Sequence, residues 1–333
     1  MLQDKNTRLK PPRIIQTLVQ GFNLIAAHPY LMLFPLLLDL FFWFGPFFRI
    51  KELLTPFLEE MLQSYSTTLV NNDVLPSVEV FREVWSQLLA NFNLLTGVRT
   101  YPIGVPSLLS LKGYTPNPVG FPLLIEVNSS AAALRVLFIS AVIGILLGSI
   151  YYALISRLIN KGKEEEKGNL FYLIGQSFSL FIMILILLAI LSFPVLCFIS
   201  SISAFIPTMG MLPLIVLGII VLWFCLPLVF SPHGIFTRNL SAIRSISLST
   251  KFVRLSSFAT SFFLTIAVSL SYGMDLLWST PKPDSWLFLL GLFGHAFISS
   301  GILCASFIYF RDGTRWMEEV IKLSPQNVNG LKM

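Results

Sequence analysis

Long apolar runs alternate along the chain with shorter segments in which apolar and polar residues recur at helical spacing. Six of the apolar runs are long enough to cross a bilayer as helices, which takes about 20 residues each. The pattern therefore predicts an all-α integral membrane protein that forms one membrane domain over residues 1–333. The six transmembrane helices are predicted at residues 29–50, 131–157, 176–204, 213–231, 258–278 and 286–310.

Amphipathic segments precede several of these runs. Residues 13–28 and 233–257 each place apolar side chains on one helical stripe and polar side chains opposite, which is typical of a helix lying on a membrane surface. Lead-ins at residues 14–34, 169–187 and 241–263 suggest three helix–span–span pseudo-repeats in parallel orientation. The alternative is that helical membrane proteins commonly carry basic amphipathic lead-ins without any repeat.

Residues 51–130 form the longest segment between two predicted spans. They carry seven acidic and four basic residues, and we predict that they form an insertion on the extracytoplasmic side. Two amphipathic helices are expected there, one over residues 52–68 and one that begins near Pro76. Prolines and glycines then interrupt residues 98–122 too often for a helix, so this part is predicted to be an ordered loop or a shallow re-entrant segment.

The distribution of charged residues predicts how the spans are oriented across the membrane. Only 12% of the residues are charged, against about 25% in soluble domains. Sixteen of the 23 lysines and arginines lie on the side that carries both termini, which predicts cytoplasmic termini in the cell membrane and an uncleaved first span as signal anchor. The formal net charge is +6, but the basic residues cluster at the ends of apolar runs, so no nucleic-acid partner is expected.

Four ionisable residues within the predicted spans are candidates for function, because unpaired charge in a bilayer is costly. Asp39 and His295 are predicted at similar depth near the middle of their spans, where they form either a proton-linked site or a structural polar pair. Arg135 and Asp275 lie near the outer ends of their spans and are expected to pair there. The alternative for all four is helix–helix hydrogen bonding or an interfacial position.

Other side chains point to structure more than to chemistry. Small residues at four-residue spacing predict close helix packing within the bundle, with homodimerisation as the alternative: Ser140, Gly144 and Gly148. The three cysteines lie inside apolar runs without metal-ligand or disulfide spacing: Cys197, Cys225 and Cys304. The three histidines are predicted at different depths, so neither a metal site nor a cofactor is expected: His28, His233 and His295.

Two stretches carry a resemblance, AAHPYLMLFPLLLDL at the first span and AIRSISLSTK before the fifth. With these, the plan of the chain resembles poorly characterised prokaryotic six-span membrane proteins, among them the membrane domain attached to some glycerophosphodiester phosphodiesterases. The resemblance implies a six-span architecture. It implies no phosphodiesterase chemistry, because the soluble catalytic barrel of the fused proteins has no counterpart here.

Three functional hypotheses follow. The first is a non-enzymatic scaffold, regulatory or assembly protein. Its expected partners are membrane lipids and a second copy of the chain or another membrane protein. This hypothesis is favoured because zincin, nucleophile-elbow, Walker A and dinucleotide motifs are missing from the sequence. The second is a permease or carrier with a polar site near Asp39 and His295. A water-filled cavity that reaches Asp39 would support this hypothesis. The third is a lipid-processing enzyme, which needs polar side chains open to lipid under the loop at residues 98–122.

Overall fold

The computed structural model describes residues 11–68, 75–160, 168–205 and 212–329. These residues are mainly helical, and five helical segments are long and apolar enough to cross a membrane, or six if one bent pair counts as a span. The prediction of a helical, multi-pass membrane protein is thereby confirmed. The five segments are α5 (Ser130–Ile159), Leu170–Pro194 within α6 (Leu170–Phe205), Gly218–Arg238, α10 (Ser257–Trp278) and Phe288–Lys322 within α11 (Phe288–Asn329).

The bent pair forms the amino-terminal part of the bundle. Helix α1 (Ile14–Ala27) meets a second helical segment at 94°, and that segment consists of η1 (Pro29–Met32) and α2 (Leu33–Phe44). Gly45 then adopts an extended conformation before Pro46, since a residue that precedes proline is disfavoured in a helix. The predicted end of the first span at Ile50 is therefore wrong. Residues Phe47–Arg49 instead form β1, which pairs in parallel with β2 (Leu124–Glu126).

Helix boundaries at the other end of the bundle also differ from the prediction. Residues 231–255 form two helices, α8 (Ser231–Arg238) and α9 (Ala242–Leu255), because Asn239 takes a left-handed conformation with φ 52°. Residues 231–237 of α8 are buried, so α8 is part of the bundle and not a surface helix. The preceding span is broken as well: α7 (Leu212–Cys225) is followed by η5 (Leu226–Leu228), which includes Pro227.

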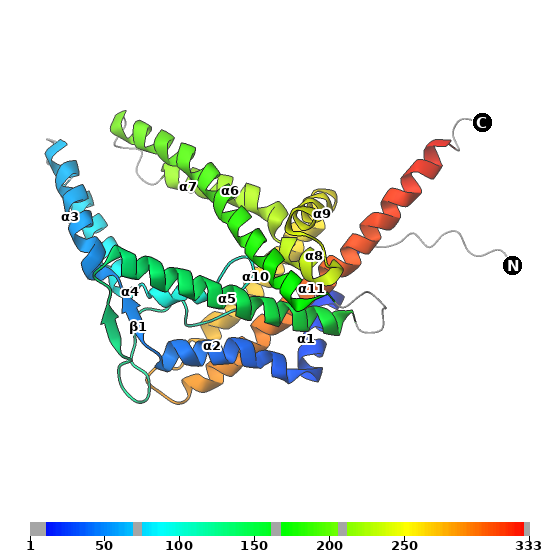
Figure 1. The fold of residues 1–333 in the computed structure, drawn as a ribbon, viewed down its shortest axis with the longest axis horizontal. Helices are drawn as coiled ribbons and strands as arrows, with labels where there is room; N and C mark the ends of the chain where they lie inside the picture. The colour runs from blue at the N-terminus through cyan, green and yellow to red at the C-terminus, as the bar shows by residue number, and fades with distance from the viewer. Residues whose placement is uncertain (1–10, 69–74, 161–167, 206–211, 330–333) are drawn as a thin grey trace.

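Two helices are longer than predicted. Helix α6 runs without a break through the second amphipathic lead-in, so no separate surface helix exists in that proposed unit. Helix α11 does not end near residue 310 but continues to Asn329, because the polar residues that follow Phe310 change the surroundings of the helix without stopping it. Figure 1 shows α11 extending well beyond the bundle.

The segment after β1 forms a helical hairpin at the opposite end from α1, α8 and α9 (Figure 1). Its helices are α3 (Lys51–Thr68) and α4 (Leu75–Asn91), which pack through Leu58, Leu62 and Leu89. A short 3-10 helix, η3 (Leu94–Val98), leads back to the bundle. The main apolar core lies between α1, α5, the first half of α6, α8 and α11. A second apolar cluster includes Phe263 of α10, which stacks on Tyr309 of α11 at 4.3 Å.

Candidate functional site

The residues that follow η3 enter the bundle as a deep re-entrant segment beside α5. A Cβ atom on Gly144 would lie 2.2 Å from the Val98 carbonyl oxygen, and one on Gly148 would lie 2.8 Å from the Gly104 Cα. Gly148 is 18 residues after Ser130, about 27 Å along the axis of α5. The expectation of an ordered loop or a shallow re-entrant segment therefore underestimates the depth, because the segment passes the middle of the helix.

This packing explains the stripe of small residues on α5. Ser140 packs against Gly97, because a Cβ atom added to Gly97 would lie 3.1 Å from the Ser140 Cβ. Gly144 and Gly148 have no side chain, which leaves space for the backbone of the re-entrant segment. The stripe thus receives a non-helical segment of its own chain and not a second helix. Irregular backbone at this depth is tolerated only when protein surrounds it, and the stripe provides that cover.

Asp39 anchors the returning part of the re-entrant segment to α2. Its side chain is 0% exposed, and Oδ1 accepts hydrogen bonds from Ser107 Oγ at 2.6 Å and from the Leu109 backbone N–H at 3.0 Å. Asp39 lies near the middle of α2, six residues after Leu33 and five residues, about 7.5 Å, before Phe44, where the helix ends. The residue therefore fixes the segment 99–112 to the middle of α2.

The structure brings His295 and Asp275 to the same place. His295 Nε2 lies 3.9 Å from Asp39 Oδ2, and His295 Nδ1 lies 2.7 Å from Asp275 Oδ1. A carboxylate only accepts hydrogen bonds, so Nδ1 donates to Asp275 and Nε2 faces the second oxygen of Asp39. We call these four residues the Asp39 cluster: Asp39, Ser107, Asp275 and His295.

The expected pair between Arg135 and Asp275 does not form. Arg135 is exposed on α5, whereas Asp275 projects from α10 toward α11 and binds His295. The reason is that α10 packs against α11. Arg135 lies near the amino-terminal end of α5, and a long basic side chain at the end of a membrane span can reach the polar interface.

Two residues near the cluster lie outside the spans and were not singled out by the sequence pattern. Ser107 is part of the proline-rich stretch, where nothing in the local sequence marks its partner. Lys112 Nζ lies 5.0 Å from the centre of the Phe288 ring. Burial lowers the pKa of Lys112, while the charges of Asp39 and Asp275 act in the opposite direction. Both residues come from the segment whose path only the tertiary structure defines.

The geometry of the cluster does not suit nucleophilic catalysis. A serine nucleophile needs a base within hydrogen-bond reach, but the Ser107 hydroxyl donates to Asp39 and not to His295. In the part of the chain that the structure describes, no group of three or more His, Cys, Asp or Glu side chains is arranged to hold a metal ion. Cys225 and Cys304 are free thiols there. The cluster can hold helices together, and His295 lies between the buried Asp39 and Asp275, whose side chain is 30% exposed. The 3.9 Å between His295 Nε2 and Asp39 Oδ2 is longer than a hydrogen bond.

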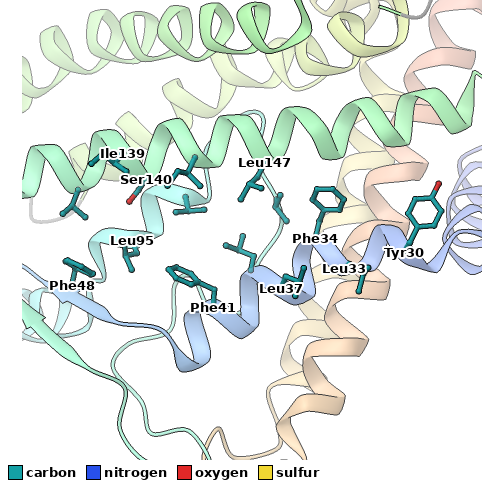
Figure 2. Close-up of a pocket in the computed structure, with 15 residues that line it drawn as sticks. Tyr30, Leu33, Phe34, Leu37, Phe41, Phe48, Leu95, Ile139, Ser140 and Leu147 are labelled. Carbon is teal, nitrogen blue, oxygen red and sulfur yellow. The ribbon is translucent and has the colours of Figure 1, made fainter. Parts of the chain in front are cut away.

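A separate groove lies between α2 and α5 (Figure 2). Its volume is about 770 Å³, and Leu37 and Phe41 of α2 face Ile139 and Leu147 of α5 across it. Among its lining residues only Tyr30 and Ser140 carry a polar side-chain atom. Neither Asp39 nor His295 lines it, so the groove offers hydrocarbon contact and no polar route to the cluster.

Comparisons with protein-family models, with curated proteins and with solved structures found no match for this chain. The resemblance to six-span membrane proteins thus stays a prediction, and function has to be argued from the geometry.

Proposed function

We propose that the chain is a six-span, non-enzymatic membrane protein that holds the α3–α4 hairpin at the outer membrane surface for assembly with another membrane protein. The observation that carries this proposal is an uncovered apolar stripe on a hairpin whose base is fixed to the bundle. The Asp39 cluster has a structural part in this proposal, because it anchors the segment that connects the hairpin to the spans.

The base of the hairpin is tied to the bundle by several polar contacts. Arg49 of β1 forms an ion pair with Glu126 of β2. Asn93 Oδ1 accepts hydrogen bonds from the backbone N–H groups of Phe48 and Leu95, both at 3.1 Å. Arg82 of α4 contacts Glu59 of α3 at 3.3 Å. These contacts support a hairpin of defined orientation, which a binding surface needs.

The stripe itself lies on α4. Val84 and Leu88 are four residues apart and share one face of the helix, and Phe92 follows directly after the helix ends at Asn91. The three side chains are 41% to 55% exposed. A helix that binds a partner through an apolar face shows this spacing of anchor residues. The partner that fits is a protein with an apolar helical face at the outer end of its own spans.

Photo-crosslinking in cells tests this function. A benzophenone amino acid at Leu88 is expected to give one discrete protein adduct, whereas the same probe at Glu83, which is exposed on another face of α4, gives none. The double variant Val84→Ser and Leu88→Ser should lose co-purification of that partner without loss of the folded protein. Adducts to lipid alone at Leu88 would contradict the proposal, because the stripe would then lie on the membrane surface.

The proposal includes six spans with both termini in the cytoplasm of the cell. The bent pair supplies the sixth span, and the bias of lysine and arginine gives the direction. A reporter that is active only in the cytoplasm should work when it follows Met333 and fail when it is inserted after Thr68. Activity at both positions would overturn this topology.

A second candidate function is a proton-linked carrier. It is favoured by the position of His295, which lies 3.9 Å from Asp39 and 2.7 Å from the partly exposed Asp275. In proteoliposomes that contain a pH-sensitive dye, a carrier would dissipate an imposed pH gradient, and Asp39→Asn would abolish this. Equal proton flux in the variant and the unaltered protein would exclude the relay.

A further inference from the structure

The inner end of the bundle carries a polar pocket of about 440 Å³ that is separate from the Asp39 cluster. Its lining combines the end of α5, the end of α8 and one face of α11. We call it the arginine pocket, and its residues are Asn160, Thr237, Arg238, Asn239, Arg311, Arg315 and Glu318. It lies where α5, α8 and the apolar part of α11 all reach their ends on the same side.

The pocket carries excess positive charge. Three arginines and one glutamate give its lining a net charge of +2, and Asp312, which accepts a hydrogen bond from Arg311 at 2.7 Å, reduces this to +1. Two of the arginines are held in place by the fold. Arg238 binds Glu318 and the Thr314 hydroxyl, and Arg311 donates to the Ile159 carbonyl at 2.8 Å.

Two polar groups in the pocket have no partner within the described residues. Arg315 makes no hydrogen bond or ion pair there, although it is one helical turn from Arg311 on the same face of α11. Asn160 donates through Nδ2 to the Thr237 carbonyl at 3.0 Å, but its Oδ1 atom is buried without a donor. A ligand with a negative group for the arginines and a hydroxyl for Asn160 would satisfy both.

From this arrangement we infer that the arginine pocket binds a phosphate group that carries a hydroxylated substituent, as in the headgroup of an anionic glycerophospholipid of the inner leaflet. Planar guanidinium groups bind phosphate oxygens through paired hydrogen bonds. Basic pockets between transmembrane helices on the cytoplasmic side suit anionic headgroups for the same reason. Arg315 is the residue that the ligand recruits, and Asn160 Oδ1 accepts from the hydroxyl.

Ligand protection against unfolding tests the site on the full chain in detergent. Short-chain phosphatidylglycerol should raise the midpoint of thermal unfolding with saturation, and phosphatidylcholine of the same chain length should not. Arg315→Gln should weaken this protection by about fivefold or more. The matched control is Arg254→Gln, because Arg254 is exposed on α9, on the same side of the bundle but outside the pocket.

A second arm distinguishes the source of the phosphate. If inorganic phosphate protects as well as phosphatidylglycerol and Arg315→Gln abolishes both effects, the phosphate site is supported and its ligand is a free anion. Protection by phosphatidylglycerol alone supports the lipid headgroup. Equal protection of the Arg315 and Arg254 variants, or no protection by either compound, overturns the inference. Asn160→Ala should weaken binding of phosphatidylglycerol and leave that of inorganic phosphate unchanged, since only the former carries an alcohol hydroxyl on a substituent of the phosphate.

Discussion

The Asp39 cluster and the arginine pocket are polar sites at opposite ends of the same bundle, and they differ in how their charges are satisfied. Asp39 is fully buried and its Oδ1 accepts two hydrogen bonds from a segment of its own chain, while its Oδ2 and the facing His295 Nε2 make no hydrogen bond within the described residues. The arginine pocket is a cavity in which one arginine and one amide oxygen have no partner within the described residues. The comparison teaches that the Asp39 cluster is tied to the backbone of its own chain through one carboxylate oxygen, whereas the arginine pocket leaves a whole charged side chain available to a ligand.

The difference also appears in what each site connects. The Asp39 cluster links α2, α10 and α11 to the re-entrant segment, so its loss affects the path of the backbone. The arginine pocket lies at helix ends that pack through other residues, among them Ser156, whose hydroxyl donates to the Phe236 carbonyl at 2.6 Å. Substitutions in the two sites are therefore expected to have effects of different size.

Replacing Asp39, which anchors the re-entrant segment to α2, should have the largest effect on stability. Asp39→Ala leaves the Ser107 hydroxyl and the Leu109 N–H without their acceptor, which is expected to lower the free energy of unfolding by about 2–5 kcal/mol. Asp39→Asn retains an acceptor oxygen and should lose much less. Denaturant titration in detergent measures both values. Wild-type stability of the alanine variant would show that the cluster does not hold the re-entrant segment.

Filling the small-residue stripe should have the next largest effect. Gly144→Ala places a methyl group against the Val98 carbonyl and should cost about 1–3 kcal/mol, because backbone and not a flexible side chain has to move. The control is Gly175→Ala on α6, where no atom lies within 4 Å of the added carbon and the helix gains up to about 1 kcal/mol. The same denaturant titration compares the two. Similar stability for both variants would mean that the segment does not pack against α5.

Replacing Arg238, which is paired within the arginine pocket, should have a moderate effect on stability. Arg238→Gln loses the ion pair with the partly exposed Glu318 and the hydrogen bond to the buried Thr314, so a cost of about 1 kcal/mol is expected. Thermal unfolding in detergent without added lipid measures it. A loss as large as that of Asp39→Ala would make the pocket a structural site and remove the contrast.

Replacing the unpaired arginine should have the smallest effect on stability. Arg315→Gln is expected to change the free energy of unfolding by no more than about 0.5 kcal/mol in the absence of ligand, because it removes no contact within the described residues. Its effect should appear only when an anionic phosphate compound is present. Marked destabilisation without ligand would contradict the assignment of Arg315 to binding.

Much of the fold could be predicted from local pattern. The apolar runs indicated the helices, and the prolines and glycines of residues 98–122 indicated the irregular segment between them. Predicted ends failed where a single residue decides the backbone: Gly45 before Pro46 ends α2, and Asn239 separates α8 from α9. The end of α11 was misplaced for the opposite reason, because polar residues after Phe310 mark the membrane boundary and do not stop a helix.

The candidate site was predictable only in part. Asp39 and His295 drew attention because ionisable residues are rare in apolar runs, and the structure places them 3.9 Å apart. The predicted pair of Asp275 and Arg135 was wrong, because similar depth in the bundle does not determine which helices are neighbours. Ser107 could not be found, since a serine in a proline-rich stretch carries no signal of its partner.

The sequence by itself determined the helical membrane class and the residues whose charge needs a partner, because hydrophobicity and helical period are properties of neighbouring residues. Only the tertiary structure decided who those partners are. Ser107 and Asp39 lie 68 positions apart, and Arg238 and Thr314 lie 76 apart. Contacts at such separations depend on which helices pack together and on the space left by Gly144 and Gly148, and no local pattern encodes that.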